Sequence, residues 1–166
     1  SEGKGTSVYG YAGHAEGRGT KSYGSFSHTE GSETIAGDAE RVNEFLYNHS
    51  LSNPVAAHAE GNHTTAEGKH SHSEGHNTHA YGEDSHSEGC LTYAHGNYSH
   101  AEGYITKAIG NYTHAEGHGT TASNDYSHAE GWNTSASNSG HAEGASTQAS
   151  GYISHAEGRS TQASGS

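Results

Sequence analysis

The chain has 166 residues, only 28% of them hydrophobic, and a formal net charge of −12. So few large apolar side chains exclude a conventional hydrophobic core, and the acidic balance argues against nucleic acids and anionic membranes as partners. Cys90 is the only cysteine, which excludes an intrachain disulfide, and no apolar run in the sequence is long enough for membrane insertion.

A tetrapeptide, HAEG or its variants HSEG and HTEG, recurs every 14 residues with two exceptions. Each unit divides into two similar halves, such as SHAEG at 99–103 and TKAIG at 106–110. Small residues alternate with others in each half, which is the period of a β-strand, and glycine closes each half at a turn that needs a positive φ. Two strands and two turns predict one coil of a parallel β-solenoid, and the strict period argues against disorder.

In chain order, we expect one continuous solenoid domain with an interruption. Residues 1–36 hold the first repeats and begin within a unit, so we expect the chain to be a segment of a longer protein. The single 30-residue step, between His28 and His58, contains an insertion of 16 residues, roughly at 37–55. Residues 56–166 resume the pattern, with one 13-residue step at 138–140 that we interpret as a deletion in a turn.

The insertion at 37–55 is predicted to form a short amphipathic helix and a loop. Val42, Phe45 and Leu46 have helical spacing, and Asp38 is a suitable N-cap. We interpret the insertion as a plug over one edge of the solenoid. The alternative is a contact loop for a receptor or a neighbouring protein, with Asp38, Arg41, Phe45 and Tyr47 as its contact residues.

The alternation also assigns the faces of each coil. Ser, Thr and Ala face inward and form a thin core, whereas the outward face of the first strand repeats His and Glu and that of the second strand varies. A face that repeats predicts a partner that also repeats, and the simplest is an identical chain in register around a threefold axis. We therefore expect an obligate homotrimer with a polar axis. Its ladder comprises His14, Glu16, His28, Glu30, His58, Glu60, His72, Glu74, His86, Glu88, His100, Glu102, His114, Glu116, His128, Glu130, His141, Glu143, His155 and Glu157.

The repeat resembles the YadA-like head repeat, and the SHAEG wording is most similar to phage tail-fibre and neck-appendage proteins. The resemblance covers about nine-tenths of the chain, everything outside 37–55. It implies a trimeric left-handed parallel β-roll of 14-residue repeats. It also implies binding to a host surface receptor or glycan and to other fibre or virion proteins. One departure is that the adhesin head carries aliphatic residues where this chain has His and Glu.

Two classes of function follow from the resemblance. The first is a structural, receptor-binding segment of a phage tail fibre or appendage, located in the virion and used for host attachment. The alternative is the head domain of a bacterial trimeric surface adhesin, located outside the cell. A polysaccharide depolymerase is disfavoured, because eleven of the 19 carboxylates share one repeat register and an acid–base pair needs two different environments. We therefore expect no enzymatic activity and no catalytic residues.

The chemistry of the ladder leaves two interpretations. We favour a hydrogen-bonded His–Glu network without a cofactor; the alternative is a metal ion held on the axis by three imidazoles. Because a neighbouring Glu favours imidazolium, we expect folding to raise the His pKa and the assembly to be most stable in mildly acidic solution. We interpret the outward tyrosines as packing between coils, with sugar binding as the alternative.

Overall fold

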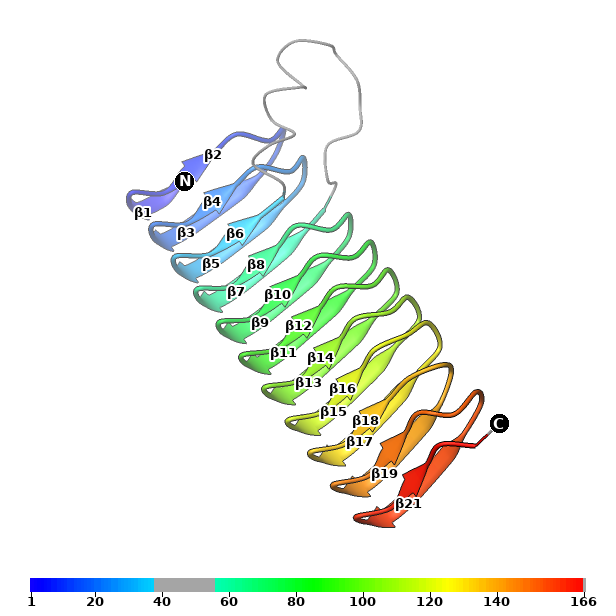
Figure 1. Cartoon of the computed structure of the whole chain (residues 1–166). Helices are drawn as coiled ribbons and strands as arrows, with labels where there is room; N and C mark the ends of the chain where they lie inside the picture. The colour runs from blue at the N-terminus through cyan, green and yellow to red at the C-terminus, as the bar shows by residue number, and fades with distance from the viewer. Residues whose placement is uncertain (38–55, 166) are drawn as a thin grey trace.

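The chain folds into a stack of parallel β-coils (Figure 1). A computed structural model describes residues 1–37 and 56–165. Within these residues all elements of regular secondary structure are β-strands, and they form two parallel sheets of 11 strands each. The predicted all-β solenoid of tandem repeats is therefore confirmed. The predicted helix and loop lie outside the described residues, as do the proposed contact residues Asp38, Arg41, Phe45 and Tyr47.

The two sheets take alternate strands along the chain. The first sheet contains the longer strands: β1 Glu2–Lys4, β3 His14–Arg18, β5 His28–Ser32, β7 His58–Asn62, β9 His72–His76, β11 His86–Cys90, β13 His100–Tyr104, β15 His114–His118, β17 His128–Trp132, β19 His141–Ala145 and β21 His155–Arg159. The second contains two-residue strands: β2 Ser7–Val8, β4 Lys21–Ser22, β6 Ile35–Ala36, β8 Thr65–Ala66, β10 His79–Ala80, β12 Tyr93–Ala94, β14 Lys107–Ala108, β16 Thr121–Ala122, β18 Ser135–Ala136, β20 Gln148–Ala149 and β22 Gln162–Ala163. Each coil therefore has one strand in each sheet, as the two halves of the repeat predict.

Pairing between coils places like residues opposite each other. In the first sheet His86 pairs with His100, and Glu88 pairs with Glu102. The offset of 14 positions in these pairs fits the spacing of the sequence repeat. At the usual strand separation of about 4.8 Å, the 11 strands of one sheet span about 48 Å.

The register continues across both irregular steps of the sequence. Strands on either side of residues 38–55 pair directly, with His28 opposite His58. The 13-residue step leaves His128 opposite His141 and is absorbed in the turn before β19. Both irregularities therefore fall outside the strands, and the ladder remains in register on either side of them.

The core between the two sheets is built from small side chains. The buried apolar side chains of the described residues are all alanines, and the buried polar ones are all serines and threonines. Alanine has almost no side-chain entropy to lose on burial, and its small size lets the two sheets approach closely. The predicted inward face of Ser, Thr and Ala is confirmed.

Glycines close the coils for two different reasons. Gly103 has a φ of 111°, and a Cβ at this position would overlap the carbonyl of Gly117 in the next coil. Gly96, in the second half of its unit, is outside the positive-φ region, but a Cβ there would overlap the carbonyl of Gly110. The expectation of positive φ is thus correct for the first glycine and wrong for the second, where close stacking of the coils is the constraint.

Several turn residues with side chains occupy the left-handed region instead. Tyr98 and Ile105 both have a φ of 56°. This conformation is strained for L-residues, above all for a β-branched side chain such as that of Ile105. The amide of Ile105 nevertheless donates to the carbonyl of Cys90 at 3.0 Å, so the stacking of successive turns holds this conformation.

Candidate functional site

The ladder residues lie side by side on the outward face of the first sheet. His and Glu are two positions apart on a strand, so both side chains lie on one face. Parallel pairing repeats them coil after coil, with centroids of successive imidazole rings 4.6–4.9 Å apart. In each of the ten units, His Nε2 lies 3.3–3.9 Å from Glu Oε2 of the same strand. One chain thus brings all the predicted ladder residues together.

The polar groups of the ladder are incompletely satisfied within one chain. His side chains are 34–56% exposed and Glu side chains 45–71% exposed. His100 and His114 form hydrogen bonds with Glu102 and Glu116 at 3.4 and 3.3 Å. Six other Nε2 atoms are buried and have no hydrogen-bond partner among the described residues: those of His28, His58, His72, His86, His128 and His141.

The protonation of the ladder differs from the sequence-based expectation. Burial lowers the pKa of His86 to about 4, assisted by His100 and His72, while Glu102 acts in the opposite direction. Burial and neighbouring histidines also lower the pKa of the ladder residues His28, His58, His128 and His141. The expected rise in pKa is therefore wrong for these residues. Loss of hydration in the half-buried column is the largest cause, and repulsion between imidazolium rings less than 5 Å apart adds to it; together they outweigh the attraction of the partly solvated carboxylates.

Metal binding within one chain finds no support in this geometry. Across residues 1–37 and 56–165, no three His, Cys, Asp or Glu side chains are grouped so that they could hold a metal ion. Cys90 Sγ lies 3.6 Å from His76 Nδ1 on the edge of the stack, but no third ligand joins this pair in the described residues. A site shared between chains on a trimer axis remains the alternative stated above.

The tyrosines at the turns stack along the solenoid, as the interpretation of them as packing residues requires. Tyr98, Tyr112 and Tyr126 form a column with centroids 5.0 and 5.2 Å apart and interplanar angles of 7° and 2°. They are 50%, 53% and 65% exposed, respectively. Their ring faces cover one another, so this column presents ring edges and hydroxyl groups to solvent.

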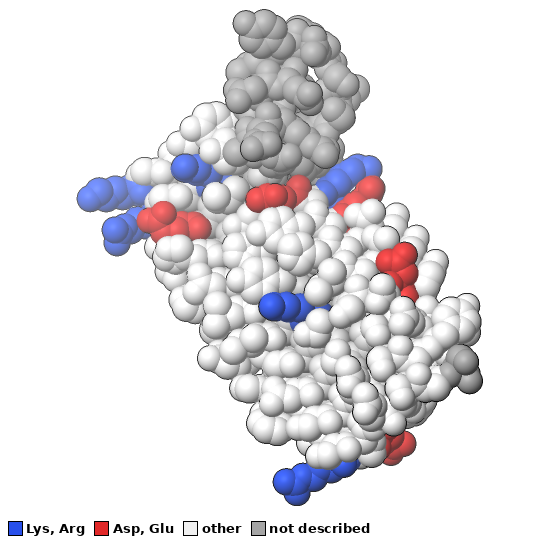
Figure 2. All heavy atoms as spheres, in the orientation of Figure 1, with Lys and Arg blue, Asp and Glu red and all other residues white. Residues whose placement is uncertain are grey.

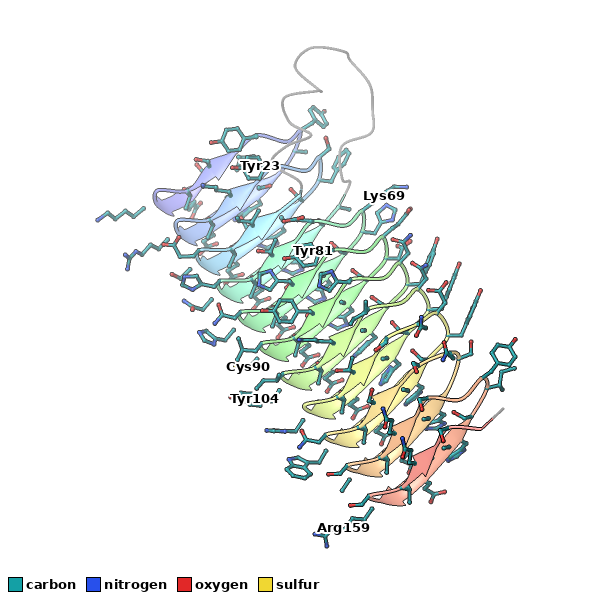
Figure 3. The ribbon with its side chains drawn as sticks, in the orientation of Figure 1. Tyr23, Lys69, Tyr81, Cys90, Tyr104 and Arg159 are labelled. Carbon is teal, nitrogen blue, oxygen red and sulfur yellow. The ribbon has the colours of Figure 1, made fainter. Side chains whose placement is uncertain are left out.

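The second sheet carries a separate aromatic patch on its outward face. His79, Tyr81, Tyr93 and His95 form a block, with His79 stacked on Tyr93 at 5.0 Å and Tyr81 on His95 at 4.8 Å. Figure 3 shows Tyr81 on the face of this sheet, whereas Cys90 and Tyr104 lie along one edge and Lys69 lies at the other. The block marks one short stretch of an otherwise varied face.

Beyond this block the surface is hollowed. Tyr93, His95, Lys107 and Ile109 line a cavity of about 410 Å³ that is open to solvent. Lys107 follows Tyr93 in the register of the sheet, so the aromatic column ends where an aliphatic stem and an ammonium group begin. Burial and the positive charge of Lys107 lower the pKa of His95.

Charge is distributed unevenly over the surface. The face in Figure 2 carries scattered Lys, Arg, Asp and Glu side chains, and most of its surface is neither acidic nor basic. No continuous row of carboxylates belonging to described residues crosses this view. The regular row of Glu side chains therefore distinguishes the ladder face from the face in view.

Two hydrogen-bonding features of the turns were missed by sequence reasoning. A hydroxyl residue precedes seven of the ten ladder histidines and closes a turn, as when Ser99 Oγ donates to the carbonyl of Gly96 at 2.5 Å. Asn97 and Asn111 accept hydrogen bonds from the backbone amides of Glu83 and Asn97, at 2.9 and 3.0 Å, so they tie successive turns together. The recurrence of Ser or Thr before His, and of Asn after Gly, was the available signal.

Comparison with protein-family models and with curated proteins finds no match to this chain. Among the described residues, the structure contains no helix with the length and apolarity needed to cross a membrane.

Proposed function

We propose that the chain is a structural, receptor-binding segment of a phage tail fibre or appendage that acts in host attachment. The observation that carries the proposal is the stack of 11 strands per sheet, in register across both irregular steps. Such a stack is a rod about 48 Å long at the usual strand spacing. Stacked His and Tyr rings run along it, and a rod of this kind suits a segment that spaces other parts of a fibre. The SHAEG resemblance to fibre proteins favours the virion over the bacterial surface.

The proposal includes a homotrimer of left-handed 14-residue coils assembled through the ladder. Three properties of one chain support it. The core offers alanine as its only buried apolar residue in the described part, so each coil removes little apolar surface from water. The ladder leaves six buried Nε2 atoms without a hydrogen bond and its carboxylates about half exposed. An identical chain in register would repeat at the same spacing and meet the half-exposed His and Glu side chains of the ladder coil by coil.

We assign no catalytic role, resident cofactor or metal to the chain. The ladder carboxylates occupy equivalent environments, which is the opposite of the two distinct carboxyls that glycoside hydrolysis requires. The proposed partners are two further copies of the chain, other fibre or virion proteins, and a receptor or glycan on the host surface.

Immunogold electron microscopy tests the location. Antibodies raised against this chain would be applied to virions purified from the source culture and to intact bacteria from it. We expect gold on slender appendages of the virions, and none on uninfected cells. Gold confined to the bacterial surface would overturn the phage assignment and favour the head domain of a trimeric adhesin.

A further inference from the structure

The outward face of the second sheet differs from the ladder because it does not repeat. One column of this face reads Thr65, His79, Tyr93, Lys107 and Thr121 in successive coils. A face that packed against another copy of the solenoid along its length would need a repeating surface. Aromatic and charged side chains that occur in only two or three coils instead suit a small ligand bound at one place.

The cavity in this stretch combines aromatic, aliphatic and cationic groups. Tyr93 and His95 stack on one side against His79 and Tyr81, so their other ring faces meet the next coil. That coil contributes Ile109, which is 45% exposed, and the exposed side chain of Lys107. Ring faces therefore bound the hollow on one side, and an ammonium group and an aliphatic side chain bound it on the other.

We propose that this hollow binds a carboxylate-bearing saccharide, with Tyr93 and His95 packing against the sugar ring and Lys107 pairing with the carboxylate. The apolar C–H face of a pyranose suits aromatic ring faces, while its hydroxyls need polar partners. Lys107 adds a charge-assisted contact and so selects an acidic sugar, even though the chain as a whole has a net charge of −12.

Other groups around the hollow are suited to hydrogen bonding with the hydroxyl groups of a sugar. His95, whose pKa is lowered by burial and by Lys107, is neutral near pH 7 and offers both a donor and an acceptor to hydroxyl groups. The next coils place Thr121 and Ser135 in the column of Lys107, so hydroxyls continue along the sheet beyond the hollow. A second sugar unit would meet these hydroxyls.

This inference rests on the proposed function and names the receptor class that such a fibre would contact. The test is isothermal titration of the assembled protein with oligosaccharides of galacturonic acid, glucuronic acid and sialic acid. Matched neutral probes are the same oligosaccharides with their carboxyl groups methyl-esterified. We expect at least one acidic probe to bind, and its ester to bind about tenfold more weakly, a difference of about 1.4 kcal/mol.

Two variants use residues that the chain itself places in this column. Lys107→Gln copies Gln148 and should weaken acidic binding to the level of the ester, without changing binding of the ester. Tyr93→Thr copies Thr121 and should weaken binding of both forms about tenfold. Lys69→Gln, at an edge of the stack beside Glu83 and away from the hollow, is the matched charge control and should change neither. Circular dichroism verifies that each variant keeps its β-structure.

Three results would overturn the saccharide site: no binding of any acidic probe, equal binding of acid and ester, or unchanged affinity in both cavity variants. None of these results would contradict the proposed homotrimer or the expected gold labelling of virions. Conversely, gold labelling confined to bacteria, combined with acidic-sugar binding, would contradict the phage location and leave the site standing.

Discussion

Ser87 and Thr92 form a hydrogen bond across the core, with Oγ and Oγ1 2.8 Å apart. Ser73 and Thr78 form the same pair in the preceding coil. Alanine occupies the serine position in seven coils, and in six of these the buried threonine hydroxyl has no partner among the described residues: Thr20, Thr64, Thr106, Thr120, Thr134 and Thr147. Coils in the same strand register thus differ in whether one buried polar atom is satisfied.

Adding or removing this serine should shift stability in opposite directions. Ala101→Ser gives Thr106 the partner that Ser87 gives Thr92, and should raise the free energy of unfolding by about 0.5–1.5 kcal/mol. Ser87→Ala removes the partner of Thr92 and should lower it by a similar amount. Urea titration of the two variants against the parent protein measures both changes. Destabilisation by Ala101→Ser would mean that the core has no room for the hydroxyl.

Ile105 is predicted to be a strained residue whose replacement stabilises the protein. Its φ of 56° is costly for a β-branched side chain, and 40% of the residue is exposed, so little packing is lost. Asn77 and Asn133 occupy the equivalent turn position in other coils, with φ values of 54° and 51°. Ile105→Asn should therefore raise the free energy of unfolding by about 1 kcal/mol.

The control for this variant is Ile109→Asn, which makes the same chemical change in the same unit. Ile109 is 45% exposed and lies outside the positive-φ region, so relief of backbone strain does not apply to it. Thermal unfolding followed by circular dichroism compares the two variants. A higher melting temperature for Ile109→Asn than for Ile105→Asn would contradict the argument from strain.

Stability should fall on acidification through the range in which the ladder histidines would gain protons. The folded pKa of His86 is lowered to about 4 from an ordinary value of 6.5, so the unfolded chain binds more protons between these values. Its contribution is fully present above pH 6.5 and is lost as pH falls towards 4. Carboxylates titrate near the lower limit, so thermal melts from pH 5 to 8 isolate the histidines.

In these melts the melting temperature should rise from pH 5 to about 7 and then level off. His86→Asn should flatten part of this rise, because it removes one group that must remain uncharged beside His72 and His100. A melting temperature that falls between pH 5 and 7 would instead restore the sequence-based expectation of protonated, Glu-paired histidines.

The architecture was predictable from the sequence because each repeat shows the same alternation of small residues, the same glycine and nearly the same length. Alternation around Ala101 assigns the buried face, the recurring glycine fixes the turn, and the constant spacing fixes the register that pairs His86 with His100. The short step before His141 was also placed correctly in a turn, because a deletion within a strand would have reversed its faces.

Other features depend on quantities that a repeat pattern does not contain. The pattern places Glu102 beside His100 but does not say how far burial and stacked imidazoles oppose protonation, so the direction of the pKa shifts was wrong for five ladder residues. The hollow at Lys107 arises where an aromatic column ends, and it is visible only once the coils are stacked. The constraint on Gly96 likewise comes from the neighbouring coil.

Sedimentation equilibrium of the whole chain at micromolar concentration, at pH 7.5, tests whether the His and Glu ladder joins three chains. We expect particles of three chains that lose their β-structure and their association together on dilution or heating, because the alanine core alone does not stabilise one coil stack. A folded, stable monomer at that concentration would contradict the claim that the His and Glu ladder is an interface between chains.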